Sequence, residues 1–254
     1  MFRTSFIAAA LTVAAGIAQA APLTGTSSGT FDSISSCTSP NTCQTANGGT
    51  VLRWGDSDTS NSNGLTNPST LTAGSFNINT SSSGQILIGQ LTWFNSATLS
   101  SRTDDDFKFD WNLNLAFNSP VGLNKTYEFN LRIQNTENSS NNPPDMIFTL
   151  PVLTGQTLTI GDYMLSNFSY SVSGANTQLT TVYGEDCFLI WCTPNNDVLG
   201  YKWINGENKT AQLNIYATVT APTTPPAEVP VPAPLALIGL GALGLGLGTR
   251  KRRD

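Results

Sequence analysis

Apolar side chains between residues 21 and 220 recur mostly at every second position, and almost no stretch shows the 3.6-residue period of an amphipathic helix. The clearest alternation runs from Phe107 to Phe117, where six large apolar residues alternate with smaller or polar ones. Residues 127–133 repeat the pattern. Because the intervening segment 118–122 contains Pro and Gly, we expect these two strands to form an antiparallel hairpin with a long loop.

Further strands are predicted along the body by the same period of two. Asn, Gly, Ser and Pro clusters separate them, which is typical of an all-β fold. We therefore expect an antiparallel β-sandwich or jelly-roll-like domain over 21–220, with one solvated face on each sheet. Trp54, Trp111 and Trp203 lie within or next to strand patterns and are predicted core residues. The further segments are 75–79, 85–94, 146–152, 157–161, 167–173, 198–204 and 211–220.

Residues 1–20 have the layout of a secretory signal peptide. Arg3 precedes an apolar stretch, and Ala18 and Ala20 occupy the small positions of an A-x-A cleavage site. The sequence thus predicts an exported chain that begins at Ala21. Export brings the body into a compartment in which disulfides persist.

The C-terminal end has three parts in a fixed order. A Pro-rich linker (221–234) is expected to be extended, an apolar segment (235–249) follows, and a short tail (250–254) is basic. The apolar part alone is shorter than the roughly 20 residues of a spanning helix, although counting from residue 229 gives about enough length. A basic tail stays on the cytoplasmic side, so the body would lie outside. A plain tail anchor and a buried C-terminal helix are the alternatives. The basic residues are Arg250, Lys251, Arg252 and Arg253.

The charges are unevenly distributed. The whole chain carries a formal net charge of −5. Five of the 12 basic and one of the 17 acidic residues lie in 1–20 and 250–254, so residues 21–249 together carry −9. An acidic body without a basic patch disfavours nucleic-acid binding.

This tail resembles the PEP-CTERM sorting signal of exopolysaccharide-producing Gram-negative bacteria, in its VPLPA form. The middle position of the motif is Val231, and no Pro-Glu-Pro is present. The resemblance implies that an exosortase, a membrane-embedded cysteine peptidase, reads the motif and removes the hydrophobic segment. It also implies transient residence in the inner membrane, followed by the cell surface or an extracellular, biofilm-associated matrix. The motif consists of Val229, Pro230, Val231, Pro232 and Ala233.

A second resemblance is to the choice-of-anchor K domain of THxN-family PEP-CTERM proteins. There a Trp-Gly pair, here Trp54 and Gly55, precedes a β segment that ends in Thr-His-x-Asn. Thr92 and Asn95 keep this pattern, whereas Trp93 replaces the His. Thr92 and Asn95 are expected to hydrogen-bond nearby backbone at a strand end. The alternative is a glycan-binding groove formed with Trp93.

Four cysteines occur in the exported part. Three pairings are possible, and we favour the two short loops Cys37–Cys43 and Cys187–Cys192. Zinc is disfavoured, because neither spacing is C-x-x-C.

Little in the chain points to catalysis. It contains no histidine, which excludes Ser-His-Asp systems and His-ligated metals. Glu185 and Asp186 are candidates for a carboxylate hydrolase, but adjacent strand residues point to opposite faces. We expect a non-catalytic surface or matrix protein without cofactor, associated with exopolysaccharide; a carbohydrate-binding module or a hydrolase is the alternative.

Two acidic segments are candidate calcium sites. Their potential ligands are Asp56, Asp58 and Ser60 in the first, and Asp104, Asp105, Asp106 and Asp110 in the second.

Overall fold

The computed structural model describes residues 20–35, 43–55, 67–97, 106–135, 144–188 and 191–223, with the backbone alone for 186–188 and 191–194. Residues Ala21–Pro222 form one compact unit. Residues 1–19 of the predicted signal peptide, the sorting motif, the apolar segment and the basic tail lie outside the described residues. Within the described ranges, no helix has the length and apolar character needed to cross a bilayer.

Strands account for nearly all regular structure in the described part of the chain, with one short 3-10 turn, η1 (Asn47–Gly49). Nine segments predicted from the alternation coincide with β5 to β11, β13 and β14. The alternation does not predict β1, β2, β3, β4 and β12. The strands are β1 (Leu23–Ser35), β2 (Cys43–Ala46), β3 (Val51–Trp54), β4 (Ser69–Ala73), β5 (Phe76–Thr80), β6 (Gly84–Asn95), β7 (Asp106–Ser119), β8 (Leu123–Gln134), β9 (Asp145–Leu150), β10 (Leu158–Ile160), β11 (Tyr163–Gly174), β12 (Thr177–Phe188), β13 (Trp191–Asn205) and β14 (Lys209–Thr220).

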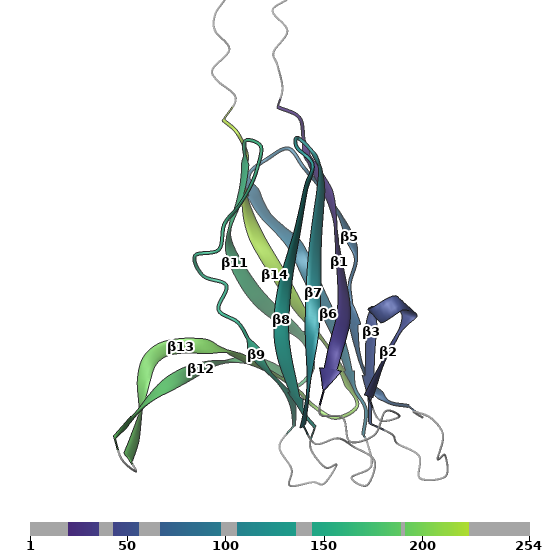
Figure 1. Cartoon of the computed structure of the whole chain (residues 1–254), viewed down its shortest axis with the longest axis vertical. Helices are drawn as coiled ribbons and strands as arrows, with labels where there is room; N and C mark the ends of the chain where they lie inside the picture. The colour runs from purple at the N-terminus through teal and green to yellow at the C-terminus, as the bar shows by residue number, and fades with distance from the viewer. Residues whose placement is uncertain are drawn as a thin grey trace, which may run out of the picture. The chain divides into compact units, whose positions relative to one another are not determined.

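Two seven-stranded antiparallel sheets pack face to face (Figure 1). The first has the order β12-β13-β9-β8-β7-β1-β5 and the second the order β10-β11-β14-β6-β4-β3-β2. This arrangement confirms the predicted antiparallel sandwich. The predicted hairpin is β7–β8, paired from Asp106↔Gln134 to Phe117↔Leu123. Its loop is shorter than predicted, because β7 continues to Ser119 and β8 begins at Leu123.

The core lies between the inward faces of the two sheets. All six apolar residues of the β7 alternation are at most 2% exposed, which confirms the face assigned from the sequence. Trp54, Trp111 and Trp203 are likewise buried. Aromatic contacts cross between the sheets, for example Trp54 with Phe107 at a centroid distance of 5.9 Å. Such pairs stabilise the sandwich beyond the burial of their area.

Strand β1 faces the core with small residues. A Cβ atom on Gly29 would lie 2.6 Å from Trp111 Nε1, so the glycine leaves the space that the indole fills. Ser27 is fully buried and donates its hydroxyl to the carbonyl of Ile88 in the other sheet, at 2.5 Å. The register of β6 against β14 shifts at Ile88, which is the extra residue of a β-bulge. The buried serine thus satisfies a carbonyl in the core.

Strands β12 and β13 extend beyond the rest of the first sheet as a two-stranded ribbon (Figure 1). Strand β13 pairs with β9 only between Tyr201 and Asn205, whereas its pairing with β12 extends to Trp191. Three large apolar side chains of the described part of the ribbon are exposed, Tyr183 at 52%, Val198 at 39% and Leu199 at 67%.

The two ends of the compact unit lie at the same end of the sandwich. Strand β1 begins there and β14 finishes there (Figure 1). Tyr163 donates its hydroxyl to the Ala21 carbonyl at 3.0 Å, and the neighbouring Met164 pairs with Thr220. The chain therefore enters and leaves this unit on one side.

Candidate functional site

The residues of the choice-of-anchor signature come together in the second sheet. Strand β4 separates β3 from β6, with Trp54 opposite Ser69 and Leu71 opposite Trp93. The Trp54 and Trp93 rings are 6.1 Å apart. Gly55 is buried at the end of β3 with φ of 70°, a conformation that favours glycine.

Trp93 lies in the core and not on a ligand-binding surface. It is 0% exposed and forms an edge contact with Trp203 of the first sheet, with centroids 5.2 Å apart. A fully buried indole cannot stack on a sugar, so the predicted glycan groove built on Trp93 is wrong. Trp93, which replaces the His of the Thr-His-x-Asn pattern, therefore packs in the core of this chain.

Asn95 joins the two sheets by hydrogen bonds. Its Nδ2 donates to the Asn205 carbonyl at 3.0 Å, and Asn205 Nδ2 donates back to the Trp93 carbonyl at 3.2 Å. The Ser69 hydroxyl donates to Asn95 Oδ1 at 3.3 Å. Asn95, Asn205 and Ser69 are all 0% exposed. Asn95 does hydrogen-bond backbone, but that backbone belongs to β13 and not to the nearby turn that the sequence suggested.

Thr92 differs from Asn95 in its surroundings. It is half-buried and pairs with Thr72 of β4 on one side and Gln212 of β14 on the other. The signature residues therefore hold strands together.

Two carboxyl groups that the sequence analysis did not identify lie beside this asparagine pair. Asp145 begins β9, is 0% exposed and is the cross-strand partner of Asn205. Glu207 lies in the turn between β13 and β14. Burial, together with the charge of Asp145, raises the pKa of Glu207 from 4.5 to about 7. Residues so far apart along the chain give no local motif, so only the strand pairing brings them together.

The structure describes only some of the predicted hydrolase and calcium residues. Glu185 and Asp186 are consecutive residues of the ribbon strand β12. Asp106 forms an ion pair with Arg132. Asp56, Asp58, Ser60, Asp104 and Asp105 lie outside the described residues. In the part of the chain that the structure describes, no three acidic or cysteine side chains gather as metal ligands.

The cysteines are described only in part. Cys43 is 5% exposed and disulfide-bonded. Cys37 and the side chains of Cys187 and Cys192 lie outside the described residues, so both pairings stay predictions. Backbone register places Cys187 opposite Cys192 across β12 and β13. Directly opposed residues of an antiparallel pair lie at a Cα separation that a disulfide can bridge.

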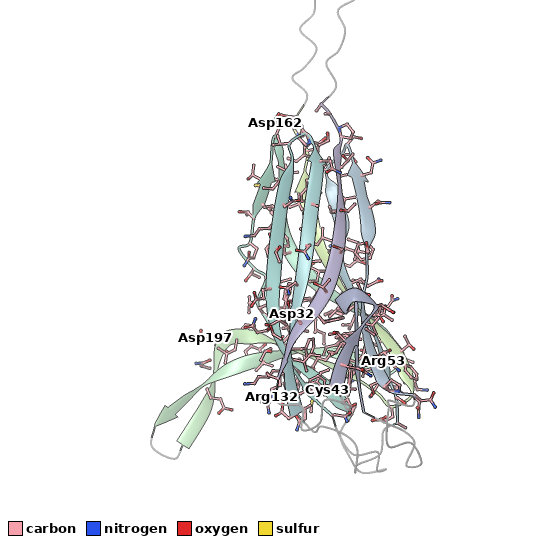
Figure 2. All side chains as sticks on the ribbon, turned by 45° about the vertical axis from the view of Figure 1, so that its right-hand side comes forward. Asp32, Cys43, Arg53, Arg132, Asp162 and Asp197 are labelled. Atoms are coloured by element: carbon pink, nitrogen blue, oxygen red, sulfur yellow. The ribbon has the colours of Figure 1, made fainter. Side chains whose placement is uncertain are left out.

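A hollow of about 550 Å³ indents the outer face of the first sheet. It is open to solvent, and its walls come from β1, β7, β8 and β9. Most of its lining residues are polar, although about half of the surface that they expose is apolar. Figure 2 labels one of its residues, Arg132, toward the end of the sandwich opposite Asp162. The lining residues are Ser33, Ser35, Lys108, Phe109, Asp110, Asn130, Leu131, Arg132 and Thr149.

No protein-family model matches the chain, and no curated protein is detectably similar to it. The two family resemblances therefore rest on the sequence motifs themselves.

Proposed function

We propose that this chain is an exported, non-catalytic protein of the cell surface or extracellular matrix, processed through an exosortase-read C-terminal signal. One observation carries the proposal: a VPLPA-like motif (229–233), an apolar segment (235–249) and a basic cluster (250–253) follow one another in order. The basic cluster after an apolar segment favours a body outside the cytoplasm. The signal-peptide pattern at the other end agrees with this orientation.

The fold is compatible with such a tether. Because the compact unit begins and ends on one side, an attachment beyond Thr220 would hold the sandwich by that side and leave the opposite end free. The outer faces present neutral polar side chains such as Asn114 and Thr126, which hydrogen-bond each other at 2.6 Å. Such a surface is well suited to a hydrated polysaccharide.

The proposal of a non-catalytic role rests on where the signature residues lie. Trp54, Trp93 and Asn95 are at most 1% exposed and support the core. The alternative of a carboxylate hydrolase would require two carboxyl groups that face each other across an open cleft. Asp145 and Glu207 are neighbours, but neither lines the hollow on the first sheet.

The test is the C-terminal mass of the mature protein, measured in producing cells with and without the exosortase. We expect the residues after the motif to be missing only when the exosortase is present. Pro232→Ala in the motif should leave the tail intact, whereas the control Pro222→Ala, upstream of the motif, should be processed normally. An exported protein that retains Arg250 to Arg253 in cells with the exosortase would contradict the proposal.

Carbohydrate binding is a second candidate function. It is favoured by the polar hollow on the first sheet, and not by Trp93.

A further inference from the structure

Two irregular strands shape the hollow on the outer face of the first sheet. In β1 the register against β7 shifts between Asp32 and Ser35, so two residues of β1 face one residue of β7. In β9 the register against β13 shifts in the same way, where Phe148 and Thr149 face one residue. Because a bulge bends its strand and increases the local twist, the flat outer face becomes concave between β1 and β9.

Both bulges contain a non-glycine residue in the left-handed region. Ser33 has φ of 50° and Thr149 has φ of 65°, and both line the hollow. For a β-branched residue such as Thr149 this conformation is a genuine outlier. Its hydroxyl donates to the Asn130 carbonyl at 2.7 Å, which helps to hold the loop of the bulge against β8. Strained backbone of this kind tends to occur at ligand-binding sites.

The side chains in the hollow form two cross-strand rows. Ser35, Lys108 and Arg132 are partners across β1, β7 and β8. Asp110 and Asn130 form the next row, two residues along the same strands. Lys108 and Arg132 are donors, Asp110 is an acceptor, and the hydroxyl of Ser35 is both. Asn130 Nδ2 donates to Glu128 at 3.0 Å, which leaves Asn130 Oδ1 as a further acceptor.

The charges in the hollow nearly cancel. The Arg132 guanidinium forms a two-pronged ion pair with Asp106 and lies 6.0 Å from the centre of the Phe148 ring, so it is held in place. Lys108 and Asp110 lie on the same face of β7 and carry opposite charges. The hollow is therefore close to neutral. Residues 21–249 as a whole carry a net charge of −9, and this negative charge would repel an acidic polymer.

We infer that this hollow is a binding site for a neutral saccharide, one or more hexose units of an uncharged polysaccharide. Adjacent hydroxyl groups of a sugar ring each donate and accept, which matches the presence of both donors and acceptors in the two rows. The volume lies within the range of about 300–1,000 Å³ that is usual for small-ligand sites. The aromatic residue among the lining, Phe109, is 1% exposed, so hydrogen bonds supply most of the affinity. We expect a Kd in the millimolar range for a single sugar, and tighter apparent binding to a polymer that presents many copies of it.

Native electrophoresis in gels that contain a polysaccharide detects binding of this strength. The protein, as recovered from the producing cell, would be run in gels with dextran, galactan, mannan or the acidic polymer alginate. We expect at least a twofold loss of mobility in one or more of the three neutral gels, none in alginate, and little change when the salt concentration is raised. Asp110→Ala and Asn130→Ala should each abolish the retardation.

Asn114→Ala is the matched control, because Asn114 lies on the same face of β7 as Asp110 but does not line the hollow. It should be retarded like the unaltered protein, and circular dichroism of all variants would establish that they fold. Normal mobility in all three neutral gels would overturn the inference, as would retardation that survives both Asp110→Ala and Asn130→Ala, or retardation in alginate alone. The inference rests on the proposed function, because an extracellular matrix would supply the polysaccharide. The C-terminal mass experiment tests that location separately, so the two failures are distinguishable.

Discussion

Replacing Glu207 by Gln should stabilise the protein at alkaline pH and leave it unchanged at acidic pH. Gln has nearly the same shape and size as the protonated Glu side chain and can also form hydrogen bonds, but it does not titrate. The reason lies in the turn between β13 and β14, where burial and the nearby Asp145 raise the pKa of Glu207 to about 7. An unfolded chain exposes the same group to water with a pKa of 4.5.

The sign follows from proton binding. Between pH 4.5 and about 7 the folded state holds the Glu207 proton more firmly than the unfolded state, so stability falls as the pH rises through this window. The loss is complete above about pH 7. Each pKa unit corresponds to about 1.36 kcal/mol, which sets an upper limit of roughly 3 kcal/mol. Because Glu207 stays partly exposed, solvent screening reduces this to roughly 1–2 kcal/mol.

Urea unfolding of both proteins at pH 4 and pH 8 measures the effect. We expect Glu207→Gln to exceed the unaltered protein by roughly 1–2 kcal/mol at pH 8 and to equal it at pH 4. Glu185→Gln, which removes the same charge from an exposed position on the ribbon, controls for net charge. The reasoning would be refuted if Glu207→Gln raised the free energy of unfolding as much at pH 4 as at pH 8, or if it made the protein less stable than the unaltered one at pH 8.

Three further changes test the interior and the bulge. Asn95→Ala removes the bond to the Asn205 carbonyl and should cost roughly 1–3 kcal/mol in urea unfolding, whereas exposed Asn79→Ala should cost nearly nothing. Trp93→His, which creates the Thr-His-x-Asn pattern, should lose roughly 2–4 kcal/mol, because a smaller polar ring replaces a buried indole; unchanged stability would contradict the packing role. Thr149→Val keeps the strained backbone but loses the hydroxyl, so its melting temperature should fall below that of Thr149→Gly, and the reverse order would count against strain at the bulge.

The sequence predicts a strand where each inward position is large and apolar. Strand β7 is the clearest example, since its six inward residues are all buried. Strand β1 is not predicted, because Gly25, Ser27 and Gly29 interrupt the large apolar residues of its inward face. These small residues make room for neighbouring side chains or, in Ser27, hydrogen-bond a bulged carbonyl. Strand β12 is not predicted for another reason: much of it lies in the ribbon beyond the core, where no alternation is required.

The candidate sites divide in a similar way. The grouping of Trp54 with Trp93 and Asn95 follows from a motif, but their burial does not, because a Thr-x-x-Asn pattern reads the same at a surface and in a core. Asp145 and Glu207 lie near each other because β9 and β13 are neighbouring strands, and the hollow depends on two bulges. Register shifts and sheet order arise from long-range packing, which no local pattern of residues encodes.

The position of β14 has a mechanical consequence for a protein held by its C-terminal side. Strand β14 is hydrogen-bonded to β11 on one flank and to β6 on the other over most of its length. A pull applied beyond Thr220, against a load at the opposite end, acts along the strand and therefore across its ladder bonds, which run perpendicular to it. These bonds would bear the force together, in shear, and would not open one after another. An anchored sandwich of this kind would resist extension in a flowing or swelling matrix far better than one attached through an edge strand.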